Sequence, residues 1–216
     1  WGGIPVFSEI DLNTYCLDPE KIENKITKKS RAIIVADIFG QSADYKMIMK
    51  LAKKYNLKVI SDSAQAIGSK HFKDFTGTNA DIGGYSLNRH KHIHTGEGGV
   101  IITNNKKLAD IMFKIRNHGE CINEDKNFRN LLGFNFRMGE VEAAVGYEQL
   151  KKLNQIIKKK QNTANLLTKH LKKLDGLKTP FVSKNNTHVY YIYPLQIDDD
   201  KIASKKNFIC NALRAE

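Results

Sequence analysis

The sequence predicts an α/β protein with a mostly parallel sheet flanked by helices. Short apolar segments at residues 32–36, 58–61 and 82–87 have the length of buried strands. A helical pattern at residues 44–55 separates the first two. Strands that alternate with helices are typical of parallel sheets, because a parallel connection needs a crossover segment.

The N-terminal part contains one predicted strand and one predicted helix start. Residues 4–10, IPVFSEI, have the composition of a short strand. Asp18 followed by Pro19 is typical of a helix start, since the carboxylate can cap the helix and proline is favoured at the first helical position. Ile22 and Ile26 are then expected on the buried side of this helix.

The central part supplies the sheet. Residues 32–36, AIIVA, are apolar throughout, which predicts a strand covered on both faces. Residues 58–61, 82–87 and 99–103 predict three more strands. The helix between the first two strands, at 44–55, places its apolar residues on one side: Met47, Ile48, Leu51, Ala52 and Tyr55.

Helices dominate the second half of the chain. Residues 106–117 predict a helix that Gly119 ends as a C-cap, and residues 139–174 predict a long helix that ends near Gly176. Residues 187–197 resemble a new strand, and a further helix is expected from about residue 203.

These elements predict two domains. Residues 1–175 form a large α/β domain, and residues 176–216 form the beginning of a smaller α+β domain. The chain opens at Trp1 in strand-like sequence and stops at Glu216 in a helical pattern. We therefore expect a piece of a longer protein, without the N-terminal segment of the large domain and without most of the small one.

Composition excludes several classes of protein. Hydrophobic residues make up 41% and charged residues 27%, which is ordinary for a soluble globular protein. No run of 18 apolar residues occurs, so we expect no membrane span. The three cysteines are widely spaced and odd in number, which argues against a disulfide framework and favours the cytoplasm.

The net charge of +12 raises the question of nucleic-acid binding. Residues 151–173 alone carry eight lysines and no acidic residue. The same stretch repeats leucine and isoleucine close to heptad spacing, which predicts an amphipathic helix with a solvated lysine face. We favour that interpretation over a nucleic-acid surface, because no aromatic residues alternate with the lysines to stack on bases.

The first motif that carries chemistry is residues 61–65, SDSAQ. Asp62 directly follows a predicted buried strand, and in open α/β sheets ligands bind at the carboxyl ends of the strands. A carboxylate there can pair with a cationic group of a ligand. Asp62 would equally serve as the N-cap of a following helix, and this segment alone does not decide between the two.

The second motif is residues 86–99, SLNRHKHIHTGEGG. The alternating His90, His92 and His94 would bind zinc only if a strand held them on one face. The GEGG segment does not have the spacing of a dinucleotide loop and precedes a strand rather than a helix. We favour a third interpretation, in which Lys91 is a working amine, since lysine forms Schiff bases with carbonyl compounds.

The third motif is residues 133–140, GFNFRMGE, at the start of the long helix. On its own this segment indicates a glycine-containing loop in which Asn135 is a turn residue.

Together the motifs resemble one family. The order of four motifs is similar to that of the DegT/DnrJ/EryC1/StrS family. The motifs are D-x-x-Q-A, then S-x4-K-x4-GEGG, then RNHG at 116–119, then G-x-N-x-RM. The resemblance runs from about Pro5 to about Leu174. It implies the aspartate-aminotransferase-like fold (fold type I) and an enzyme dependent on pyridoxal 5'-phosphate.

The resemblance also implies site residues. Lys91 corresponds to the lysine that forms the Schiff base with the cofactor and transfers the proton. Asp62 would pair with the pyridine nitrogen, Gln65 would lie near the ring hydroxyl, and Ser86 would bind the phosphate. Asn135 would reach the phosphate of a partner subunit, which implies a homodimer with shared sites.

The reaction that the resemblance implies is amino transfer from an amino acid, by family likeness glutamate, to a keto group of a nucleotide-linked sugar, for an amino sugar of a polysaccharide or glycan. Two alternatives remain at this point. A branch of the family with histidine in the lysine position dehydrates sugars, although Lys91 favours transamination. The chain could instead be a basic α/β binding module without catalysis.

Overall fold

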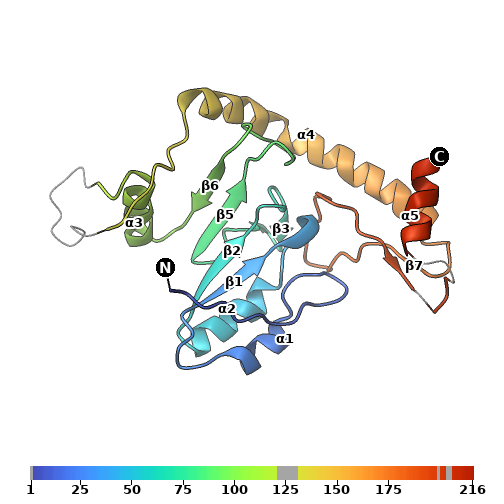
Figure 1. Ribbon diagram of the computed structural model, residues 1–216, viewed down its shortest axis with the longest axis horizontal. Coiled ribbons are helices and arrows are strands. Elements are labelled where there is room, and N and C mark those ends of the chain that lie inside the picture. The colour runs from blue at the N-terminus through green and yellow to red at the C-terminus, as the bar shows by residue number, and fades with distance from the viewer. Residues whose placement is uncertain (1, 121–130, 199, 203–205) are drawn as a thin grey trace.

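The computed structural model describes residues 2–120, 131–198, 200–202 and 206–216. Its centre is a four-stranded sheet in the order β1-β2-β5-β6 (Figure 1). The strands are β1 (Ala32–Ala36), β2 (Lys58–Asp62), β5 (Ile82–Ser86) and β6 (Gly99–Ile102). β1, β2 and β5 run parallel and β6 runs antiparallel to β5, so the predicted α/β architecture with a mostly parallel sheet is confirmed.

The helices follow the predicted order. They are α1 (Pro19–Ile22), α2 (Tyr45–Lys54), α3 (Lys106–Arg116), α4 (Glu140–Leu171) and α5 (Lys206–Ala215). Asp18 caps α1 as predicted, by accepting a hydrogen bond from the Glu20 amide at 2.9 Å. Gly119 also ends α3 as predicted: its φ is +77°, and its amide donates to the carbonyl of Lys114.

Small elements complete the fold. Two 3₁₀ turns cover Glu23–Lys25 and Ile38–Gly40. Two small antiparallel sheets pair β3 (Lys70–His71) with β4 (Asp74–Phe75), and β7 (Leu177–Lys178) with β8 (Gln196–Ile197). Of these strands, only β8 lies within a predicted one.

One strand prediction was wrong, and another holds only in part. Residues 4–10 form no strand: only Ile10 makes an isolated bridge, to Leu17, and Ile4 is 88% exposed. Residues 187–197 are strand only at Gln196–Ile197. In both cases the residues have strand propensity, but a strand forms only where a neighbouring backbone edge is available to pair with it.

The core lies on one side of the sheet. Ile33 and Val35 of β1 and Val59 of β2 point into a cluster with Ile48 and Ala52 of α2. Figure 1 shows α1 and α2 together beside β1. Along β1 exposure alternates, and Ile34 is 69% exposed, so the prediction that this strand is covered on both faces was wrong for the described chain.

A second apolar cluster ties distant segments together. Leu87 and Ile93, which follow β5, pack with Leu153 and Ile157 of α4 and with Val189. This cluster holds the segment between β5 and β6 against α4 and against the residues that follow α4. It therefore fixes the loop that contains Lys91.

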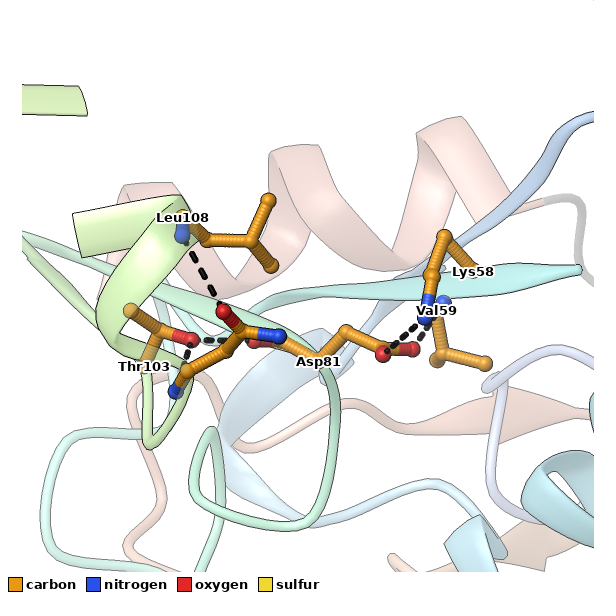
Figure 2. Close-up of polar contacts among 6 residues, drawn as sticks. Lys58, Val59, Asp81, Thr103 and Leu108 are labelled. Carbon is orange, nitrogen blue, oxygen red and sulfur yellow. Dashed lines mark hydrogen bonds and ion pairs between the residues drawn. The ribbon is translucent and has the colours of Figure 1, made fainter. Parts of the chain in front are cut away.

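Asp81, directly before β5, connects several segments by hydrogen bonds (Figure 2). Its carboxylate accepts hydrogen bonds from the Val59 amide at 2.9 Å and from the Lys58 ammonium at 3.1 Å. Its carbonyl accepts from the hydroxyl of Thr103 at 2.7 Å, just before the Asn105 cap of α3. One residue thus joins β2, β5 and the segment that leads to α3.

Replacing Asp81 by alanine should lower the free energy of unfolding by about 1–2 kcal/mol, because the amide of the buried Val59 loses a charged acceptor. Asp81→Asn keeps an acceptor and should cost less than Asp81→Ala. Urea unfolding of both variants measures the difference. Equal losses would mean that the ion pair with the 65% exposed Lys58, rather than the amide bond, is what Asp81 contributes.

Three predictions from composition concern the chain as a whole. In the described segments no helix combines the length and apolarity needed to cross a bilayer. Cys16 and Cys210 are free thiols, and Cys121 lies outside the described residues. α4 forms within the predicted 139–174 stretch, with Leu153, Ile157 and Ala164 buried.

Candidate active site

Polar residues follow the carboxyl ends of the three parallel strands. Ala36 of β1 pairs with Asp62 of β2, and Asp62 pairs with Gly84 of β5, two residues before Ser86. β1 and β2 therefore end level with each other and β5 extends two residues further, so the residues that follow the strands lie at one edge of the sheet. This is the edge at which open α/β sheets bind ligands.

Asp62 and Ser86 lie on the same face of the sheet. Residues that pair across strands share a face, and so do residues two positions apart on one strand. Asp62 is exposed on this face, and Gly84 between the two positions adds no side chain. The Asp62 carboxylate accepts a hydrogen bond from the Ala64 amide at 3.1 Å. No helix begins within the described residues 63–69, so Asp62 caps a turn and not a helix.

Gln65 is fixed to the turn that follows β1. Its side-chain oxygen accepts a hydrogen bond from the Phe39 amide at 2.7 Å. Phe39 itself has a φ of +59°, in the left-handed region. The Gln65 amide group remains a hydrogen-bond donor at this edge.

Lys91 lies in the closed loop between β5 and β6. The loop is pinned at its base, where the Leu87 amide donates to the Gly98 carbonyl and the Thr95 amide donates to the Leu87 carbonyl, each at 2.9 Å. The Lys91 ammonium lies 4.5 Å from the ring centroid of Tyr191, a cation–π contact. No carboxylate among the described residues forms an ion pair with it.

The three histidines of this loop point to different partners. His92 is buried, and its Nε2 lies 2.8 Å from the carbonyl of Val189. Burial lowers the pKa of His92, so the neutral ring donates this bond. His94 Nδ1 accepts from the Gly96 amide, and His90 lies beside Arg89. Nowhere in the described chain do three or more His, Cys, Asp or Glu side chains gather as metal ligands would.

Residues 189–192, which follow α4, contact both the turn after β1 and the loop that contains Lys91. The Val189 amide donates to the Gly40 carbonyl at 2.8 Å, and the Ile192 amide donates to the Phe39 carbonyl at 3.2 Å. The same segment carries Tyr191, which contacts Lys91, and Val189, which contacts His92. Its contacts therefore connect the turn that holds Gln65 with the loop that holds Lys91.

Asn135 lies apart from the other four predicted residues. It bridges to Asn117, just after α3, and its side-chain oxygen accepts from the Arg137 guanidinium at 3.1 Å. In Figure 1 α3, beside which this bridge lies, is well to one side of β2. Within one chain, the sheet edge thus brings together Asp62, Gln65, Ser86 and Lys91 but not Asn135.

Sequence reasoning missed a buried carboxylate at the same edge. Asp37 follows β1, and its two oxygens lie within 2.9 Å of the Ala43 amide and of the hydroxyls of Tyr45, Ser61 and Ser63. Burial raises the pKa of Asp37 from 3.8 to about 6, although the four hydrogen bonds oppose the shift. The signal that identified Asp62, a carboxylate directly after a buried strand, also marks Asp37.

Asp37 makes the stability of the protein depend on pH. Because its pKa is higher in the folded than in the unfolded chain, its contribution is fully present below about pH 4 and is lost as pH rises through about 6. The change is on the order of 3 kcal/mol. Urea unfolding at several pH values should show that Asp37→Asn gains stability relative to the wild type as pH rises from about 4 to about 7. A difference that does not vary with pH would contradict this assignment.

Comparisons with known proteins identify the family of the chain. The model of the DegT/DnrJ/EryC1/StrS aminotransferase family matches residues 1–216. The chain belongs to this family. The chain is 36% identical to the dTDP-3-amino-3,6-dideoxy-alpha-D-galactopyranose transaminase of Aneurinibacillus thermoaerophilus (92% of the chain, 54% of the relative). It is 34% identical to the GDP-perosamine synthase of Escherichia coli O157:H7 (88% and 52%).

A solved aminotransferase-like structure with a bound cofactor has the same fold. It is NtdA of Bacillus subtilis with the cofactor PMP bound, at a TM-score of 0.82 and 31% identity over 92% of this chain and 46% of that one. The fold is that of the pyridoxal-phosphate-dependent aminotransferases of fold type I, and the enzymes of the DegT family depend on this cofactor. The chain spans about half the length of the curated relatives that it matches.

The residues at the sheet edge fit pyridoxal phosphate chemically. The cofactor carries an aldehyde, a ring nitrogen that can be cationic, and a phosphate. The edge offers an amine at Lys91 that no described carboxylate engages, an exposed carboxylate at Asp62 and a hydroxyl at Ser86. Asp62 and Ser86 face the same open side of the sheet, where one ligand can contact both.

Proposed function

We propose that the protein transfers an amino group to a keto group of a nucleotide-linked sugar, with pyridoxal phosphate as the cofactor and an amino acid, glutamate by family likeness, as the donor. The observation that supports this proposal is that Asp62 and Ser86 share one face at the carboxyl ends of β2 and β5, with Lys91 in the loop that directly follows β5. The transaminase and synthase relatives named above support the sugar substrate.

Each residue has a proposed task. Asp62 would hold the ring nitrogen in its protonated form, and Ser86 would hold the phosphate. Gln65, oriented by its bond to Phe39, would donate to the ring hydroxyl. When bound, the cofactor supplies an electron sink that stabilises negative charge on the carbon that loses its proton.

Lys91 would move that proton. Its amine would bind the cofactor covalently at rest and, once released, would act as general base and then as general acid. The hydrogen bonds at the base of the loop limit the positions that the Lys91 amine can reach. The flexible lysine side chain would still let the amine reach both the carbon that loses the proton and the carbon that receives it.

We further propose a cytoplasmic homodimer in which Asn135 serves the partner's site. Support comes from its position away from Lys91 and from large apolar residues that are exposed around it and along the start of α4: Leu132, Phe136, Val141, Val145 and Tyr147. Such a surface is typical of protein–protein contacts. We also retain the proposed division into a large domain, 1–175, and the start of a small one, 176–216.

The test begins with the absorbance spectrum of the protein mixed with pyridoxal phosphate, before and after borohydride. We expect an absorbance band from the bound cofactor, and borohydride should attach that cofactor irreversibly to the peptide containing Lys91. When glutamate is supplied, we expect amination of a nucleotide-linked keto-sugar. Sugar dehydration without amination, and without a band that borohydride fixes onto the Lys91 peptide, would favour the dehydratase. Salt-sensitive nucleic-acid binding without any band would favour the basic binding module.

A further inference from the structure

The buried carboxylate of Asp37 is built into the end of β2. Ser61 and Ser63, which hydrogen-bond to it at 2.8 Å and 2.7 Å, are the two residues on either side of Asp62. The Asp37 amide also donates to the Asp62 carbonyl at 2.9 Å. Asp37 therefore contacts the backbone of Asp62 and both of its neighbours in the chain.

The two carboxylates lie on opposite faces of the sheet. Side chains alternate along a strand, so Ser61 and Ser63 point toward the core while Asp62 points to the open face. The Tyr45 hydroxyl completes the core side, 2.9 Å from Asp37 and 2.6 Å from Ser61. On the core side, hydrogen bonds therefore hold the end of β2 in place. On the opposite face, the Asp62 carboxylate is exposed and can contact a ligand.

We propose that Asp37 is a positioning residue for Asp62: it fixes the end of β2 from the core side and adds a second negative charge behind the carboxylate that receives the cationic ring nitrogen. This inference rests on the proposed function and deepens it. It assigns to Asp37 no contact with the cofactor or with substrate.

The cost of the buried charge supports this role. Above pH 6 the carboxylate is ionised in a nearly water-free environment, and its four hydrogen bonds only partly offset the cost of this burial. A group that lowers stability and lies against a ligand-binding edge is a candidate for function, since functional sites commonly oppose stability.

The experiment compares two ligands that bind without a covalent bond. The first is pyridoxamine phosphate, and the second is its analogue with CH in place of the ring nitrogen. Both are titrated into the wild type, Asp37→Asn, Ser63→Ala and Asp62→Asn. Asp74→Asn, which removes an exposed carboxylate on β4, is the control. Urea unfolding at neutral pH is measured on the same samples.

We expect Asp37→Asn to bind pyridoxamine phosphate about tenfold more weakly than the wild type, as is typical when a residue that orients a ligand-binding group is lost. Its affinity for the CH analogue and its stability should not fall. Equal losses for both ligands, or no loss for either, would overturn the proposal. If the wild type itself does not prefer pyridoxamine phosphate over the analogue, and Asp62→Asn changes nothing, the proposed function fails instead.

Discussion

Replacing Lys91 by alanine abolishes covalent attachment of pyridoxal phosphate and lowers the rate of amino transfer by roughly 10⁴-fold or more, because proton transfer by a positioned group alone contributes 10²–10⁴-fold. No other lysine of the described chain has its ammonium over Tyr191 at this sheet edge. The variant should fold, since the Lys91 ammonium forms no ion pair with a described residue and the loop is closed by backbone hydrogen bonds.

Borohydride trapping followed by mass analysis of the labelled peptide measures attachment, and the keto-sugar assay measures the rate. Lys50→Ala, which removes an exposed lysine of α2, is the matched control and should behave as the wild type. Pyridoxamine phosphate should still bind to Lys91→Ala, because it needs no covalent link. Trapped cofactor on a second peptide, or retained amino transfer, would show that Lys91 is not the reacting amine.

Replacing Gly83 by alanine destabilises the protein by more than about 2 kcal/mol, whereas the same change at the adjacent Gly84 has little effect on stability. A β-carbon at Gly83 would lie 2.8 Å from both the α-carbon and the carbonyl carbon of Gly77, inside van der Waals contact with backbone. Gly77 cannot withdraw easily, because its φ of +96° and the Tyr85 side chain against it restrict this turn. A β-carbon at Gly84 would have its nearest neighbour at 3.9 Å.

Urea unfolding of the two variants is the measurement, and they control for each other, since both place one methyl group on β5. A loss of stability in Gly84→Ala as large as that in Gly83→Ala would mean that any added side chain disturbs this strand. Gly83→Ala at wild-type stability would show that the turn at Gly77 yields. Either outcome would contradict the tight packing of this turn beneath the sheet edge.

The sequence predicted the elements whose causes are local. Apolar runs of strand length marked β1, β2, β5 and β6, and Asp18 and Gly119 marked helix ends. These signals work because periodicity, capping and glycine conformation depend on residues a few positions apart. The motif spacing also identified the residues that the structure gathers at the sheet edge. Their roles in catalysis remain predictions.

The tertiary structure decided what depends on distant partners. Residues 4–10 have strand composition but form no strand with any segment that the structure describes, and AIIVA is covered on only one face there. His92 bonds to Val189, 97 positions away in the chain, and Asp37 collects donors from three later segments. Local sequence fixes which residues can pair or be buried. Packing of the whole chain decides which of them do, because each such contact needs a partner that only the fold brings close.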